Sequence, residues 1–177
     1  MIDRKVRIIS SKIMYKGKWV KLRKDEIIKP DGTRATHEVA ERNDCVIIVA
    51  FKNNKFALVR MYRYPVNDKS WEFPMGFINK GETVKMAAIR ELEEETGLVA
   101  TNIKSLGSFW ISPGLLTQRA YVFYANNFSL SKTKHDKTEA DLEMAYFSRK
   151  QINALLKDGS MRNGATLATI GLLAPQN

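Results

Sequence analysis

Five glutamates lie within fourteen consecutive positions of a 177-residue chain whose net charge is +10. They are Glu82, Glu91, Glu93, Glu94 and Glu95, out of eleven glutamates in the whole chain. Like charges at neighbouring helical positions repel one another, by about 0.2–0.5 kcal/mol per pair, unless something compensates them. A bound divalent cation is the natural compensation, because carboxylate oxygens are the ligands that Mg²⁺ and Mn²⁺ prefer. The cluster therefore predicts a metal-dependent site.

These glutamates fall in a predicted helix that runs from about residue 83 to residue 96. Gly97 can take the left-handed conformation that commonly ends a helix. At about 100° per residue, Glu91 and Glu95 lie about 40° apart, and Glu94 lies about 60° from Glu91 on its other side. The same sector holds the apolar and small residues of the helix. We therefore expect these three carboxylates to face the protein interior.

The alternative is a solvated helix face, which is the usual meaning of a run of charges. On the helical wheel only Glu93 points that way. Buried carboxylates need partners, and Arg90 stands four residues before Glu94, at the spacing of an intrahelical ion pair. We therefore expect Arg90 to be a structural clamp and a cation to bind the inward-facing glutamates.

The composition argues against several other chemistries. The two histidines, His37 and His135, lie far apart and no Cys-x-x-Cys pair occurs, so a zinc site is not expected. The glycines form neither a dinucleotide-binding motif nor a Walker A loop, and there is no Gly-x-Ser-x-Gly elbow. The single cysteine favours a reducing compartment. Without a membrane-length apolar run or a secretory signal, we expect a cytoplasmic protein with no membrane partner.

Positive charge dominates the chain, with 29 Lys and Arg against 19 Asp and Glu. Such a balance favours an anionic partner such as a nucleotide, a polyphosphate or a nucleic acid. Much of it lies in the first 24 residues, where it alternates with apolar residues. This alternation is also what a half-exposed strand produces, so the charge by itself does not select a partner.

Segments rich in Val, Ile and aromatic residues, separated by Gly, Pro and Asn turns, predict many strands and few helices. The order predicts a mixed α/β sandwich and not a doubly wound sheet. We divide the chain into an N-terminal strand region, 1–42, and a main domain, 43–177. The N-terminal strands either form a separate small sheet or exchange with another subunit. The expected strands are 4–14, 18–29, 34–41, 45–51, 55–64, 71–73, 103–111, 119–126 and 142–147, and the expected helices are about 83–96, 148–157 and 164–173.

The glutamate-rich segment resembles the signature of the Nudix hydrolases, G-x5-E-x7-R-E-U-x-E-E-x-G-U, where U is a bulky aliphatic residue. The flanking VRMYRYPVNDKSWEFPMG, the later Ser-Pro-Gly at 112–114 and the closing RNGATLATIGLL resemble the ADP-ribose and other nucleoside diphosphate sugar pyrophosphatases of this family. The resemblance implies a Nudix-type α/β/α sandwich with a mixed sheet, preceded by N-terminal antiparallel strands. All nine specified positions are filled, by Gly76, Glu82, Arg90, Glu91, Leu92, Glu94, Glu95, Gly97 and Leu98.

The resemblance also implies an activity, a cofactor and an assembly. The activity is Mg²⁺-dependent hydrolysis of the pyrophosphate bond of a nucleotide sugar, with ADP-ribose, converted to AMP and ribose 5-phosphate, as the expected substrate. The assembly is a homodimer, and a nucleic acid partner is not expected. Glu82 is implied to orient Arg90 or a metal-bound water. The implied metal ligands are Glu91, Glu94, Glu95 and the backbone carbonyl of Met75, where the family usually has alanine, and the implied substrate contacts are Arg60, Arg63 and Glu72.

Two features depart from the resemblance. The loop after the Ser-Pro-Gly, residues 115–119, lacks the acidic residue that many ADP-ribose enzymes carry, which keeps GDP-mannose and ADP-glucose open as substrates. The family's general base commonly lies on a late loop, here 132–140, where Glu139 is the candidate beside Glu94 and Glu95 as catalytic carboxylates. Asp136 and Asp141 are alternatives to Glu139. A pyrophosphohydrolase of RNA ends and a catalytically silent Nudix binding module also remain as alternatives.

Overall fold

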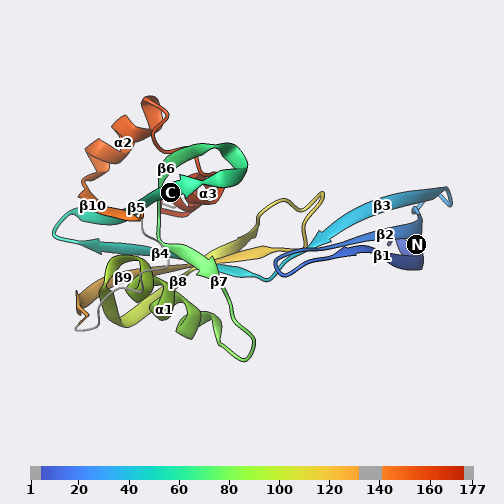
Figure 1. Cartoon of the computed structure of the whole chain (residues 1–177), viewed down its shortest axis with the longest axis horizontal. Helices are drawn as coiled ribbons and strands as arrows, with labels where there is room; N and C mark the ends of the chain where they lie inside the picture. The colour runs from blue at the N-terminus through green and yellow to red at the C-terminus, as the bar shows by residue number, and fades with distance from the viewer. Residues whose placement is uncertain (1–4, 132–140, 174–177) are drawn as a thin grey trace. The chain divides into compact units, whose positions relative to one another are not determined.

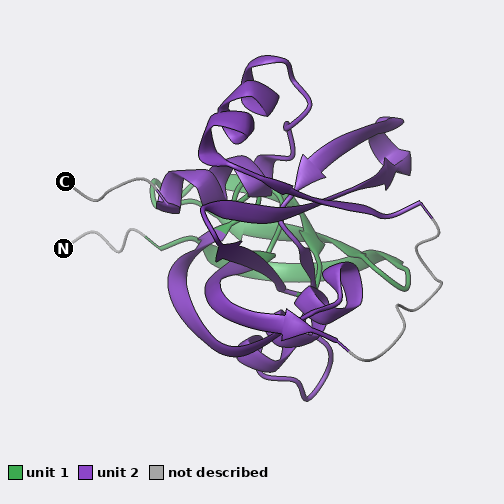
Figure 2. Cartoon of the chain, turned by 90° about the vertical axis from the view of Figure 1, so that its left-hand side faces the viewer, with its two compact units in different colours: residues 1–43, 110–119 green, residues 44–109, 120–177 purple. Residues whose placement is uncertain are grey.

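The apolar run that starts at Cys45 forms strand β4 (Cys45–Lys52), whose residues from Cys45 to Ala50 are buried. The computed structural model describes residues 5–131 and 141–173 of the chain. These group into two compact units, one of residues 1–43 and 110–119 and one of residues 44–109 and 120–177 (Figure 2).

In the second unit, β4 belongs to a seven-stranded mixed sheet with the order β10-β5-β4-β9-β8, in which β6 pairs with β5 and β7 pairs with β4 (Figure 1). β4 runs parallel to β9 and antiparallel to β5 and β7. A strand that is covered on both faces reads as a continuous apolar run, which explains the sequence of β4. The other strands are β5 (Lys55–Arg63), β6 (Asp68–Glu72), β7 (Met75–Phe77), β8 (Leu98–Trp110), β9 (Arg119–Leu130) and β10 (Glu143–Phe147).

Helix α1 (Val84–Thr96) packs its small residues against this sheet. Ala87, Ala88 and Leu92 are fully buried in the core cluster that includes β4. The Thr83 hydroxyl caps the helix by accepting from the Met86 N–H, at 3.2 Å. At the other end Gly97 has φ +67°, which confirms the predicted left-handed helix end. The position and limits of the helix therefore follow from local sequence.

Two further helices close the described chain, α2 (Arg149–Lys157) and α3 (Gly164–Leu173). Ser148 caps α2 in a reciprocal capping box with Gln151, as its sequence position predicts. In the described ranges, no helix has the length and apolar character needed to cross a membrane.

The first unit contains an antiparallel sheet of β1 (Arg7–Lys16), β2 (Lys21–Ile28) and β3 (Arg34–Glu41), in that order. All ten residues of β1 are exposed, including Ile8, Ile13 and Met14. Asp25 of β2 is buried, where it accepts from the Ser11 hydroxyl at 2.6 Å and pairs with Arg23.

The predicted mixed α/β arrangement with N-terminal antiparallel strands is confirmed, but two strand predictions were wrong. The expected strand at 71–73 is two strands, β6 and β7, separated by Phe73 and Pro74. They pair with different neighbours, and the polar Asp68 and Lys69 conceal the start of β6. The strand expected at 103–111 begins at Leu98, directly after the end of α1.

Candidate active site

The glutamates of α1 do not all face the interior. The side chain of Glu91 is 12% exposed and Glu95 is 6% exposed, whereas the side chain of Glu94 is 51% exposed. The helical wheel therefore predicted Glu91 and Glu95 correctly but was wrong for Glu94, which lies at the edge of the packed sector. It was also wrong for Glu93, which is half-buried and accepts from the Ser131 hydroxyl at 2.6 Å.

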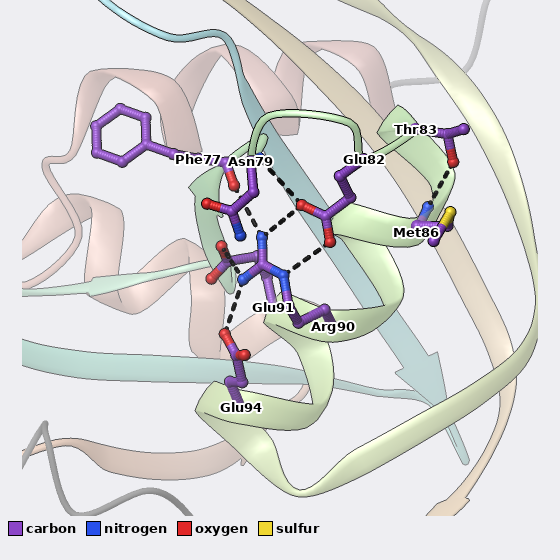
Figure 3. Close-up of polar contacts among 8 residues, drawn as sticks. All are labelled: Phe77, Asn79, Glu82, Thr83, Met86, Arg90, Glu91 and Glu94. Atoms are coloured by element: carbon purple, nitrogen blue, oxygen red, sulfur yellow. Dashed lines mark hydrogen bonds and ion pairs between the residues drawn. The ribbon is translucent and has the colours of Figure 1, made fainter.

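Arg90 connects three of the glutamates, as Figure 3 shows. Its guanidinium donates to both oxygens of Glu82, at 2.8 and 2.9 Å. It also donates to Glu91 at 2.7 Å, to Glu94 at 2.8 Å and to the Phe77 carbonyl at 2.9 Å. The predicted i, i+4 pair with Glu94 is thus one part of a larger clamp that holds α1 to the end of β7.

Within the clamp, one guanidinium bonds three carboxylates, so negative charge is in excess. The hydrogen bonds from Arg90 lower the pKa of Glu82, and this effect exceeds the opposing effect of burial; the Asn79 N–H contributes in the same direction. The bonds to Glu82 in turn raise the pKa of Arg90, with smaller contributions from Glu91 and Glu94. Glu82 and Arg90 therefore stay charged at neutral pH.

Strand β7 approaches α1 closely because it carries a glycine at the contact. A Cβ at Gly76 would lie 2.1 Å from the Glu91 carboxyl carbon and 2.2 Å from each of its oxygens. Next to it, the Met75 N–H donates to the Glu95 carboxylate at 3.0 Å. The missing side chain makes a space that the Glu91 carboxylate occupies, with the Met75 backbone beside it.

The donors at this point fit a hard divalent cation. Glu91 and Glu95 supply mostly buried carboxylate oxygens, and oxygen-only ligands suit Mg²⁺ or Mn²⁺. In residues 5–131 and 141–173, no three His, Cys, Asp or Glu side chains are grouped closely enough to hold an ion in this conformation, because Glu91 and Glu94 turn toward Arg90. Glu91 would exchange its contact with Arg90 for the ion.

The predicted substrate residues separate into two groups. Arg63 donates twice to Glu72, at 2.9 Å for each bond, and Glu72 is 1% exposed. Arg60 stands three positions before Arg63 on an uninterrupted strand, so the two side chains leave opposite faces of β5. Arg60 pairs with Glu143 at 2.7 Å and lies over the Trp71 ring, 4.7 Å from its centroid. Arg63 and Glu72 therefore contact each other on one face of β5, and Arg60 lies on the opposite face.

Sequence reasoning missed Asn163, whose amide donates to Glu72 at 2.9 Å. Its side-chain oxygen accepts from the Thr166 N–H at 3.0 Å, as a helix-capping residue does. The capping position before α3 was visible in the sequence, but the contact with a residue 91 positions away was not.

The candidate general base Glu139, and its alternative Asp136, lie outside the described residues. Asp141, the other alternative, accepts from the Tyr62 N–H at 2.9 Å and so fastens the chain to β5. On the other side of 132–140, the Ser131 N–H donates to the Gly97 carbonyl at 2.6 Å.

At one position of the loop after the Ser-Pro-Gly, Gln118, the structure disfavours an acidic residue. Gln118 is buried, and its amide donates to the Asn43 carbonyl at 2.8 Å. A carboxylate at this position has no hydrogen to donate and would face the carbonyl oxygen.

Comparisons with known proteins identify the family of the chain. The sequence model of the NUDIX domain matches residues 41–169, and that of the nucleoside diphosphate sugar hydrolase N-terminal domain matches residues 6–40. The chain is 33% identical over 124 residues to a methanol dehydrogenase activator of Bacillus methanolicus, covering 70% of this chain and 67% of that protein. It is 29% identical to the ADP-ribose pyrophosphatases of Bacillus subtilis, covering 75% and 72%, and of Mycobacterium tuberculosis, covering 98% and 84%.

A solved structure confirms the expected fold class. The chain superposes on the crystal structure of an ADP compounds hydrolase with a TM-score of 0.85. The match covers 96% of this chain and 92% of that one, at 22% sequence identity.

Proposed function

Because the chain belongs to the Nudix hydrolases and carries the N-terminal domain of nucleoside diphosphate sugar hydrolases, we propose that it hydrolyses ADP-ribose to AMP and ribose 5-phosphate in the presence of Mg²⁺. The observation that carries this proposal is the pair of mostly buried carboxylates, Glu91 and Glu95, held between Arg90 and a glycine-bearing strand. Two relatives named ADP-ribose pyrophosphatase support the choice of substrate.

We assign the cation to Glu91, Glu94, Glu95 and the carbonyl of Met75. When bound, Mg²⁺ neutralises charge on the pyrophosphate and lowers the pKa of a bound water. In the structure Arg90 donates to the Glu91 carboxylate at 2.7 Å, and Glu91 would give up this bond to bind the ion. We assign the removal of a proton from the attacking water to Glu139, with Glu94 and Glu95 as the other catalytic carboxylates.

We propose Arg63 and Glu72 as substrate contacts, because they are linked to each other and lie close before Met75 in the chain. An arginine held by a carboxylate is pre-oriented to donate to phosphate oxygens. Arg60 is the weaker candidate of the two arginines, since its side chain leaves the face of β5 opposite Arg63. If an Arg60→Ala variant keeps the KM of wild type, Arg60 is not a substrate contact.

We also propose a homodimer. β1 exposes apolar side chains along its whole length, including Ile8, Ile13, Met14 and Tyr15, each more than half exposed. Apolar area of this kind on a sheet usually marks an interaction surface. A second copy of the chain is the partner that the N-terminal strand region implies.

The test is an assay of the purified protein with Mg²⁺ against ADP-ribose, ADP-glucose, GDP-mannose and triphosphorylated RNA. We expect turnover of ADP-ribose, lost in Glu95→Gln, since the amide can still accept from Met75 but carries no charge for the cation. Glu38→Gln, an exposed glutamate of β3, is the matched control and should be fully active. If only GDP-mannose or ADP-glucose is turned over, the proposed pyrophosphate hydrolysis stands and the proposed substrate is wrong.

Two other outcomes would overturn the proposed activity. Turnover restricted to RNA ends would favour an RNA-end pyrophosphohydrolase, which the net charge of +10 makes worth testing. Binding of nucleotide sugars without any turnover would favour a silent binding module.

A further inference from the structure

A cavity of about 520 Å³ in the second unit lies beside the Arg63–Glu72 pair. It is bounded by η1 (Tyr64–Val66), by β6 and by the residues that lead into α3. This volume is within the range of small-molecule sites, roughly 300–1,000 Å³. The carboxylates of α1 do not line it, whereas the proposed substrate contacts Arg63 and Glu72 do.

The walls of the cavity differ in chemistry. Pro65 and Val66 form an apolar wall, and Val66 is 69% exposed. Asp68 and Arg162, which also line the cavity, offer an acceptor and donors that are paired at 3.0 Å while both remain substantially solvated. A pair of this kind can open toward a ligand at low cost, because water already screens it. The polar groups can therefore both donate to and accept from a ligand.

Among the described residues, three cationic and two anionic ones line the cavity, Arg63, Lys69 and Arg162 against Asp68 and Glu72. Lys69 and Arg60 both pair with the one carboxylate of Glu143, at 3.4 and 2.7 Å. Arg60 and Glu143 do not line the cavity, so this group contributes to it only through Lys69. An anionic group on the ligand is favoured at this side.

The cavity is close to the place where the pyrophosphate would be held. Glu72 lines it and precedes Met75 by three residues, a chain distance of at most about 11 Å. Resting on the proposed function, we propose that this cavity receives the sugar half of the nucleotide sugar, with Asp68 and Arg162 bonding to its hydroxyls and Pro65 and Val66 lying against its ring.

The lining favours a sugar over a nucleobase. Nucleobases commonly stack on aromatic side chains, and no residue that lines this cavity, among those the structure describes, is aromatic. Hydroxyl groups both donate and accept, which matches neighbouring Asp68 and Arg162. The apolar face of a sugar ring needs only an aliphatic wall.

The test is calorimetric binding of ribose 5-phosphate, glucose 1-phosphate and AMP to the full chain with Mg²⁺. The variants are Arg162→Ala, which removes the hydroxyl contacts, and Val66→Trp, which fills the cavity from an exposed position. We expect each to weaken binding of at least one sugar phosphate by about tenfold and to leave the affinity for AMP unchanged within about twofold. Lys157→Ala, an exposed lysine in the last turn of α2, is the control and should change neither affinity.

Weaker binding of AMP with unchanged sugar phosphates would overturn the proposal and place the nucleotide half in the cavity. Unchanged affinities for all three ligands, or no binding of either sugar phosphate by wild type in the millimolar range, would also overturn it. If wild type hydrolyses ADP-ribose but the variants bind ribose 5-phosphate normally, the proposed activity stands and only the cavity assignment fails.

Discussion

Gly76→Ala is the substitution that most directly tests how the site is built. The new Cβ would lie 2.1 Å from the Glu91 carboxyl carbon, whereas non-bonded carbon atoms approach to about 3.5 Å. The Glu91 carboxylate must therefore move by about 1 Å or more. Because it is the free end of a flexible side chain, it can move without unfolding the protein.

The magnitudes follow from the contacts that are lost. Displacing Glu91 breaks its 2.7 Å bond with Arg90, and a hydrogen bond between charged groups contributes about 1.5–3 kcal/mol when buried. The lower backbone entropy of alanine in the unfolded chain recovers about 0.4–1 kcal/mol. We expect the free energy of unfolding to fall by about 1–2 kcal/mol. A catalytic group misplaced by about 1 Å costs about 10²-fold in rate, so the loss of kcat/KM should be much larger than the loss of stability.

Urea denaturation and Mg²⁺-dependent hydrolysis of ADP-ribose measure the two effects. Gly171→Ala is the matched control, since a Cβ there meets nothing within 4 Å and alanine favours the helix interior. This variant should keep full activity, and its free energy of unfolding should rise by a few tenths of a kcal/mol or more. If Gly76→Ala keeps kcat/KM within twofold of wild type, the close approach of β7 to Glu91 has no part in catalysis.

Three other predictions concern the clamp and the cation. Arg90→Ala should lower the free energy of unfolding in urea by about 2–4 kcal/mol because it removes the positive partner of the mostly buried Glu82 and Glu91; a loss below about 1 kcal/mol would contradict the clamp. Since Arg90 lowers the pKa of Glu82 in the folded state, wild type should lose stability as the pH falls from about 4.5 through that lowered pKa. In the same pH range, the free energy of unfolding of Glu82→Gln should fall less steeply with pH than that of wild type. Equal slopes for the two proteins would refute this. EDTA should abolish turnover but leave the far-UV circular dichroism unchanged, because the bonds from Arg90 already tie Glu82, Glu91 and Glu94 together; unfolding by EDTA would show that the ion is structural.

The predicted homodimer is tested by light scattering at micromolar concentration. Ile13→Lys, which places a charge on the exposed apolar strand β1, should shift wild-type dimer toward monomer without unfolding the second unit. A wild-type monomer at this concentration would refute the homodimer.

The pairing of Arg90 with Glu94 was predictable because its determinants are local. The spacing of Glu82, Arg90 and the α1 glutamates lies within one helix and the loop before it, so helical geometry alone predicts the Arg90–Glu94 pair. The limits of α1 were equally local, since Thr83 and Gly97 act on their own helix ends. Buried strand β4 was recognisable because coverage on both faces requires a continuous apolar run.

Only the tertiary structure decided which groups from distant segments meet. The contact of Asn163 with Glu72 spans 91 positions, and the division of residues 68–77 into β6 and β7 depends on pairing with two different strands. The helical wheel could not show that Glu94 is half exposed, because exposure depends on what covers the edge of the helix. The glycine requirement at residue 76 likewise arises only when β7 packs against Glu91, since steric contact is a property of neighbours in space and not of neighbours in sequence.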